Sequence, residues 1–112
     1  MPAEVPKLHH ENLDCYQTAL SLLALATRLL KDLPRRQGEL GDQLRRATIS
    51  IPPGIAEGHA KRSPRDRSRS YDSARGSATE SGAILDAARI LGALDEERYA
   101  EGKTMLHRLV CW

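Results

Sequence analysis

An apolar stripe that continues through a Pro-Pro pair is the feature that most constrains the fold of this chain. The stripe consists of Leu40, Leu44, Ala47, Ile51, Ile55 and Gly58, with spacings of 4, 3, 4, 4 and 3 residues. Such spacings place the residues on one face of a helix. Proline inside a helix removes a backbone hydrogen bond and clashes with the preceding turn, yet the period continues past Pro52 and Pro53. We therefore expect a helix that is kinked at the prolines and shaped by packing against its neighbours.

The composition indicates one small domain of closely packed helices. The 112 residues include no Phe, one Trp and three Tyr, so Leu, Ile and Ala must form the core. Small residues let helix backbones approach closely. The longest nearly apolar run, residues 19–26, is much shorter than the roughly 20 residues that span a bilayer, and the N-terminal segment has no apolar signal-peptide core. We expect a soluble, cytoplasmic protein with no membrane partner.

Capping residues and prolines divide the chain into helices, beginning with two in the first half. The first helix is expected to begin after Asn12, whose side chain can accept a free backbone N–H, and to stop at Pro34. The second is expected over residues 39–60. There the hydroxyls of Thr48 and Ser50 can bond to backbone carbonyls and ease the bend.

Two further helices complete the expected fold. Ser63 is the expected N-cap of the third helix, Gly92 its C-cap, and Asp95 the cap of the fourth. Short connections between long amphipathic helices favour an all-α, up-down-up-down four-helix bundle. We assign this domain to residues 12–112 and expect residues 1–11 to be a disordered or loosely ordered tail.

A difference in helix length suggests self-association. The third helix would have about 28 residues and the fourth about 17, so part of the third helix's apolar flank is expected to lack a partner within the chain. An uncovered apolar face favours contact with further copies. We therefore expect a homo-oligomer. The alternative is a shorter third helix and a frayed C-terminal end.

The sequence shows no pattern typical of an enzyme or a metal site. Cys15 and Cys111 are the only cysteines, and no Cys or His pair has ligand spacing with a second pair to complete a site. No nucleophile elbow or phosphate-binding glycine loop is present. We expect two reduced thiols, no catalytic residue, no metal and no cofactor. The histidines interpreted as surface residues are His9, His10, His59 and His107.

Positive charge is concentrated in the middle of the chain. Residues 35–75 hold ten basic and five acidic side chains, whereas residues 1–34 hold three and four and residues 76–112 four and six. Arginine suits phosphate because its planar guanidinium donates two parallel hydrogen bonds. The candidate nucleic-acid contacts are Arg35, Arg36, Arg45, Arg46, Lys61, Arg62, Arg65, Arg67, Arg69 and Arg75. Only Tyr71 offers a stacking platform in this block, so binding would be electrostatic and shape-driven.

Local ion pairs offer a simpler interpretation of the same charges. The pairs at helix spacing are Asp42–Arg46, Arg62–Asp66 and Asp72–Arg75. Glu57 and Glu80 are interpreted as structural partners of Arg45 or Arg46, in a buried or interfacial ion pair. Neither acid has a second carboxylate or a histidine at a spacing that suits acid catalysis.

Two blocks carry a family resemblance: RR-x4-IP-x2-IAEG, from Arg45 to Gly58, and ARGSxxE, from Ala74 to Glu80. With these blocks, the chain from about Leu13 to its end resembles the bacterial four-helix bundle proteins encoded in intervening sequences of large-subunit ribosomal RNA genes. The same superfamily includes the accessory variability proteins of diversity-generating retroelements.

The resemblance implies a four-helix bundle that assembles into a homopentameric ring. For the retroelement members it also implies a positively charged surface that binds nucleic acid and the reverse transcriptase. The chain departs from the family pattern in two ways. The family often has Asn at the position of Gly54, and its fourth helix usually runs beyond the position of Trp112. The second departure bears on the ring interface and the ring size. The expected function is a non-enzymatic oligomer that binds RNA or DNA through its arginines, as an accessory to a larger enzyme. The alternative is a scaffolding homo-oligomer with protein partners only.

Overall fold

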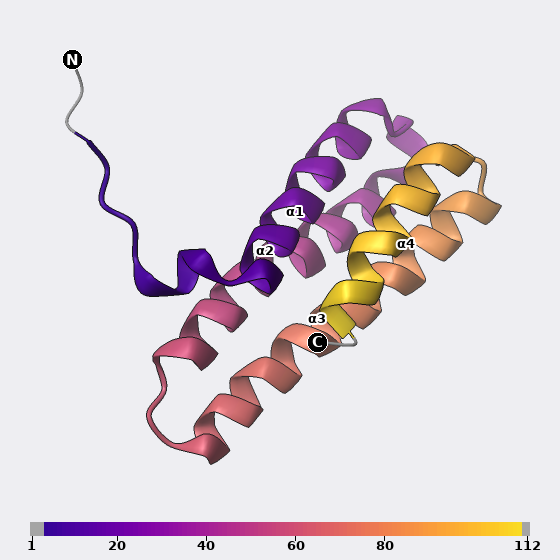
Figure 1. The fold of residues 1–112 in the computed structure, drawn as a ribbon. Coiled ribbons are helices and arrows are strands. Elements are labelled where there is room, and N and C mark those ends of the chain that lie inside the picture. Colours follow the sequence, from indigo (N-terminus) through magenta and orange to yellow (C-terminus); the bar gives the residue numbers. More distant parts are fainter. Residues whose placement is uncertain (1–3, 111–112) are drawn as a thin grey trace.

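The computed structural model describes residues 4–110, which form an antiparallel bundle of α-helices (Figure 1). The helices are α1 (Asp14–Asp32), α2 (Gly38–Ala60), α3 (Pro64–Ile90) and α4 (Glu96–Val110), with two 3-10 helices, η1 (His9–Asn12) and η2 (Arg35–Gln37). Each α-helix packs against the next along the chain, and α1 also packs against α4. The all-α, up-down-up-down four-helix bundle is therefore confirmed.

Aliphatic side chains from all four α-helices form the core. The largest fully buried apolar side chains are Leu22, Leu25, Ile51, Ile55, Leu85 and Leu109. The apolar stripe of α2 points into this core: Leu44 and Ala47 are also buried, and Leu40 packs against the cluster as a partly buried residue. The period of the sequence thus identified the inward face of α2 correctly.

The helix α2 continues through Pro52 and Pro53 from Gly38 to Ala60. Proline is tolerated here because α2 packs against both α1 and α3, which hold its backbone from two sides. Two hydroxyls return to the preceding turn as expected: Thr48 Oγ1 donates to the Leu44 carbonyl at 2.8 Å, and Ser50 Oγ donates to the Ala47 carbonyl at 2.8 Å. The bend at the prolines stays a prediction.

The closest helix contact joins α2 and α3 through small residues. A Cβ placed on Gly58 would lie 2.5 Å from the Tyr71 ring, and a Cβ placed on Gly54 would lie 3.0 Å from the Ala74 methyl. Glycine at both positions therefore lets α3 lie directly on α2. Ser50 Oγ and Ser77 Oγ lie 2.7 Å apart across the same seam, and since the Ser50 hydrogen goes to the Ala47 carbonyl, the Ser77 hydroxyl donates in this pair. This contact holds together the two helices that carry most of the arginines.

The expected caps of α3 and α4 are confirmed. Ser63 Oγ accepts from the Asp66 backbone N–H at 3.2 Å, and Asp95 Oδ1 accepts from the Arg98 backbone N–H at 2.8 Å. Gly92, two residues after the end of α3, adopts a φ of 73°, a conformation that glycine reaches without steric cost. These residues set the turns on either side of α3.

The expected start of α1 is wrong. Asn12 ends the 3-10 helix η1, and Leu13 is the residue that precedes α1, without a capping side-chain bond. The reason is local: the Leu13 backbone N–H donates to the His10 carbonyl at 3.0 Å, so the chain already turns before α1 begins. This turn lies partly within residues 9–11 of the expected tail and packs against α1 and α2.

The α2–α3 connection protrudes from the bundle. Figure 1 shows the α1–α2 and α3–α4 connections at one end, and the α2–α3 connection extending beyond the start of α1 and the end of α4 at the other. We call residues 60–73 the hairpin tip. The expectation of an uncovered apolar flank on the third helix is wrong for the described residues, because Ala74 and Ala78 are 2% and 0% exposed against α2. The exposed side chains of the first turns of α3 are polar, and Ile90 at its end is the exposed large apolar residue of this helix.

Candidate nucleic-acid interface

The structure divides the ten candidate residues between opposite ends of the bundle. Arg35 and Arg36 lie in η2, and Arg45 and Arg46 lie in the following turns of α2. The candidates from Lys61 to Arg69 lie at the hairpin tip, at the other end of α2 and α3, and Arg75 lies further along α3 (Figure 1). A helix rises 1.5 Å per residue, so about 21 Å of α2 separates Arg46 from the tip. The ten residues therefore do not form one surface.

The hairpin tip has the higher density of positive charge. Residues 61–69 hold five basic side chains and one acid, a net charge of +4, and every one of these residues is exposed. The five are Lys61, Arg62, Arg65, Arg67 and Arg69. Arg67 uses its Nε to donate to the Lys61 carbonyl, which ties the first turn of α3 back to the connection. The remaining guanidinium nitrogens of Arg67 still face outward for an external anion.

Local pairing removes little of this charge. Of the three pairs expected at helix spacing, the structure forms Asp72–Arg75, with an N···O distance of 2.6 Å. Within residues 4–110, neither Arg62–Asp66 nor Asp42–Arg46 approaches to ion-pair distance, and the five basic residues of the tip have no carboxylate partner. The tip thus keeps its cations available.

The opposite end of the bundle is more nearly neutral. Two acids lie among the four arginines of residues 35–46. The start of α4 lies at the same end and adds Asp95, Glu96 and Glu97. Ion pairs cross this half of the bundle at Arg89–Glu96, Arg98–Asp32, Lys103–Asp86 and Arg28–Glu101, with N···O distances of 2.7, 2.8, 2.9 and 3.9 Å. Hydrogen bonds from Lys103 and from Tyr99 hold the pKa of Asp86 below its ordinary value. This end therefore holds more carboxylates than the hairpin tip, but its four candidate arginines form no ion pair among residues 4–110.

Tyr71 is not a free stacking platform. Its ring packs over Gly58 and is half-buried in the α2–α3 seam. A base could stack on it only if the seam opened. The hairpin tip thus offers phosphate contacts without the exposed aromatic rings that usually hold unstacked bases.

The proposed structural pairs of Arg45 or Arg46 with Glu57 or Glu80 do not form within the single chain. All four side chains are exposed, and none of them is joined to another by an ion pair among residues 4–110. Arg45 lies twelve residues before Glu57 on α2, about 18 Å along the axis, which is too far for an intrachain contact. Pairing across subunits stays a prediction.

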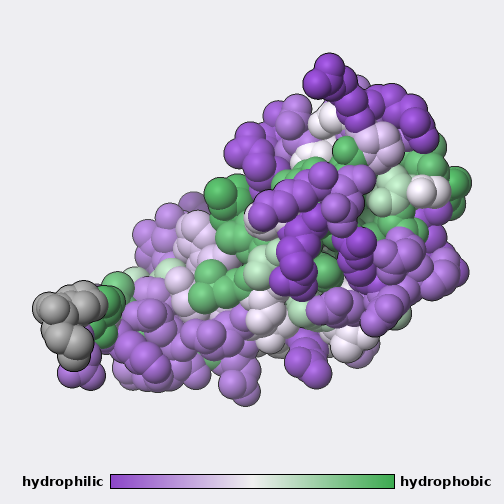
Figure 2. Space-filling model, turned by 90° about the horizontal axis from the view of Figure 1, so that it is seen from above, coloured by the Kyte–Doolittle hydropathy of each residue, from purple (hydrophilic) through white to green (hydrophobic). Residues whose placement is uncertain are grey.

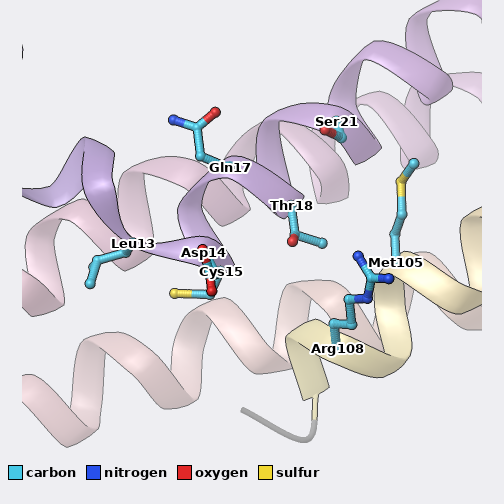
Figure 3. Close-up of a pocket in the computed structure, with 8 residues that line it drawn as sticks. All are labelled: Leu13, Asp14, Cys15, Gln17, Thr18, Ser21, Met105 and Arg108. Carbon is cyan, nitrogen blue, oxygen red and sulfur yellow. The ribbon is translucent and has the colours of Figure 1, made fainter.

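A groove of about 670 Å³ lies between the start of α1 and the last turns of α4. Figure 3 shows its lining: Leu13, Asp14, Cys15, Gln17, Thr18 and Ser21 from the start of α1, with Met105 and Arg108 from α4. Burial raises the pKa of the Cys15 thiol, so at neutral pH this residue is a thiol and not the reactive thiolate. Cys111 lies outside the described residues. The lining gives the groove no activated nucleophile.

Comparison with known protein families assigns the chain. The model of the 23S rRNA-intervening sequence protein family matches residues 11–110. The chain belongs to this family. The match includes all four α-helices and both blocks on which the resemblance rests, so the 23S rRNA-intervening sequence protein family is confirmed as the expected one. No curated protein matches the chain significantly.

Three features of this family member were not visible in its sequence. The sequence did not show that the arginines separate into two groups, that Tyr71 is engaged with Gly58, or that His9 meets His59 at 2.9 Å. The only available signal was Gly58 itself, since a glycine on an apolar helix face often marks the close approach of another helix.

Over residues 4–110, each helix is too short or too polar to span a bilayer.

Proposed function

We propose that this 23S rRNA-intervening sequence protein is a non-enzymatic, cytoplasmic homo-oligomer that binds RNA or DNA through the hairpin tip. The observation that carries the proposal is the group of five exposed basic residues between residues 61 and 69, none of which has a carboxylate partner among residues 4–110. Such cations gain from phosphate because their contacts release counterions condensed on the nucleic acid. An accessory role beside a larger enzyme is the corresponding biological proposal.

The shape of the tip favours the backbone of a duplex as its target. An α-helix with side chains is about 10–12 Å wide, and the major groove of B-DNA is about 12 Å wide. The α2–α3 pair is two helices wide and therefore broader than this groove. It would contact the phosphates along the edges of the groove and not the bases inside it. Without an exposed aromatic ring, the tip has little means of holding unstacked single-stranded bases. Binding is therefore electrostatic and largely independent of sequence.

An apolar strip on the outer side of α1 and α2 supports self-association. Leu20 and Ile49 are 38% and 50% exposed, and Ile49 borders a hollow with Leu23, Thr27 and Leu30. Figure 2 shows such hydrophobic surface exposed between hydrophilic side chains. A second copy of the chain could cover these apolar side chains, while Lys31 and Arg45 lie at the edge of the same hollow. Further copies of the chain would repeat the hairpin tip around an assembly and raise the local positive potential; the homopentameric ring is the proposed form.

Self-association is tested by light scattering on purified protein. We expect a mass several times that of the 12.4 kDa chain. Replacing Ile49 with Glu places a charge in the apolar strip and should reduce the mass toward that of the monomer, while Ile90→Glu, a charge on a residue that is 85% exposed at the end of α3, should leave it unchanged. A wild-type monomer at high micromolar concentration would refute the oligomer.

Nucleic-acid binding is tested by fluorescence anisotropy with duplex RNA and duplex DNA of equal length. We expect binding that is micromolar or tighter at low salt and that falls by about 500-fold between 50 and 200 mM salt, as for about five phosphate contacts. A single strand of the same length should bind more weakly. No binding to any of these probes at low ionic strength would leave the scaffolding homo-oligomer as the better description.

A further inference from the structure

Two histidines that are 50 residues apart in the sequence meet where η1 packs against α2. His9 Nδ1 lies 2.9 Å from His59 Nε2, and the two ring centroids are 5.0 Å apart with their planes tilted by 42°. At this distance one ring nitrogen carries a hydrogen and the other presents its lone pair. The two ring nitrogens thus face each other at the surface of the bundle, and a change of tautomer in the donor ring would leave a lone pair on both.

Neighbouring contacts bring His9 to this position. The ring of His10 packs edge-on against Tyr16, with centroids 4.7 Å apart. Gln17 Nε2, on α1, donates to the Glu11 carbonyl at 2.9 Å. These contacts fix η1 on the start of α1, and His9 then reaches the last turn of α2. The pair is thus built by three separate elements.

We propose that His9 Nδ1 and His59 Nε2 form a two-imidazole binding site for a divalent transition-metal ion of the Ni(II) or Cu(II) type. Imidazole nitrogens bind such ions at about 2.0–2.1 Å, so two nitrogens 2.9 Å apart subtend about 90° at the metal. Neighbouring ligands in octahedral and square-planar sites make this angle. A tetrahedral Zn(II) site needs a separation of about 3.3 Å at the same bond length.

The surroundings set the character of the site. His9 is exposed and His59 is half-buried, so the rings can rotate toward the ion and water can complete its coordination. No group of three or more His, Cys, Asp or Glu side chains that could hold a metal is found among residues 4–110, which makes this an open site with two protein ligands. Affinity should follow the Irving–Williams order, with Cu(II) above Ni(II). The ion would clamp η1 onto α2 beside the hairpin tip.

Calorimetric titration of the untagged protein with Ni(II) tests the site. We expect one ion per protomer, and we expect His9→Ala and His59→Ala each to weaken binding at least about tenfold. The matched control is His107→Ala, because His107 lies on α4, which does not contact η1. Wild-type affinity in His59→Ala would overturn the proposal. Loss of binding in His107→Ala would also overturn it, because the ion would then be held at another place on the protein.

Hydrogen exchange provides a second readout that does not depend on affinity. The Leu13 backbone N–H donates to the His10 carbonyl within η1, and an ion that joins η1 to α2 must slow its exchange. We expect Ni(II) to slow this exchange in the wild type and to leave it unchanged in His59→Ala, with both proteins equally helical by circular dichroism. Equal exchange of the wild type with and without Ni(II) would contradict the clamp.

Discussion

Replacing Arg62, Arg65 and Arg69 with alanine is expected to weaken duplex binding by about 100- to 1,000-fold at roughly 0.1 M salt. Each phosphate contact contributes about 0.9 to the slope of log affinity against log salt, so the slope should fall by about 2.7. All three side chains are exposed on the hairpin tip and lack a carboxylate partner among residues 4–110, so their removal leaves no buried charge and no cavity. Fluorescence anisotropy over a range of salt concentrations measures both the affinity and the slope.

A charge-matched variant distinguishes binding through the hairpin tip from binding that depends only on the net charge of the protein. Replacing Arg35, Arg36 and Arg46 with alanine removes the same three charges from the opposite end of the bundle. That end is about 21 Å or more from the tip along α2, beyond the Debye length of about 10 Å at 0.1 M salt. We expect this variant to lose less than about tenfold in affinity. Equal losses in the two variants would show that binding follows total charge and not the hairpin tip.

Replacing Ile51 with alanine is expected to lower the free energy of unfolding by about 2–5 kcal/mol. Ile51 is 0% exposed and immediately precedes the two prolines of α2. The substitution removes buried methyl groups and leaves a cavity where α2 meets the core, because a helix packed on both sides can relax only partly. Urea unfolding at fixed protein concentration measures the change, since association would otherwise alter the apparent stability.

The same substitution at an exposed isoleucine is the control. Ile90 is 85% exposed at the end of α3, and Ile90→Ala should change the free energy of unfolding by no more than about 0.5 kcal/mol. A loss at Ile51 as small as that at Ile90 would mean that the apolar stripe of α2 is not part of the core. The role of the stripe in the fold would then be wrong.

The sequence predicted the elements of this fold well because local chemistry determines them. The spacing from Leu44 to Ile55 identifies the buried face of α2, and Ser63 and Asp95 accept the backbone N–H groups at the starts of α3 and α4. A capping preference fails where another local hydrogen bond competes with it. Asn12 is a good N-cap residue, but the preceding 3-10 turn makes Leu13 the residue at the start of α1.

The candidate site was less predictable because it depends on contacts between distant segments. Helix periodicity gives the face on which a residue lies, but it does not show which ends of the helices meet. For this reason the sequence joined Arg36 and Arg65 in one basic block, whereas the bundle places them at opposite ends. Ion pairs such as Arg98–Asp32, which are 66 residues apart, are equally invisible in sequence spacing. Such pairs gather carboxylates at the end of the bundle opposite the hairpin tip.

The position of bound nucleic acid is the most direct test of the hairpin tip. Backbone amide NMR spectra of the wild-type protein, recorded with and without a short RNA duplex at low salt, report which residues it contacts. We predict the largest shift changes within residues 60–73 and small changes within residues 35–46. Changes concentrated in residues 35–46, or spread evenly over all exposed basic residues, would contradict the proposed interface.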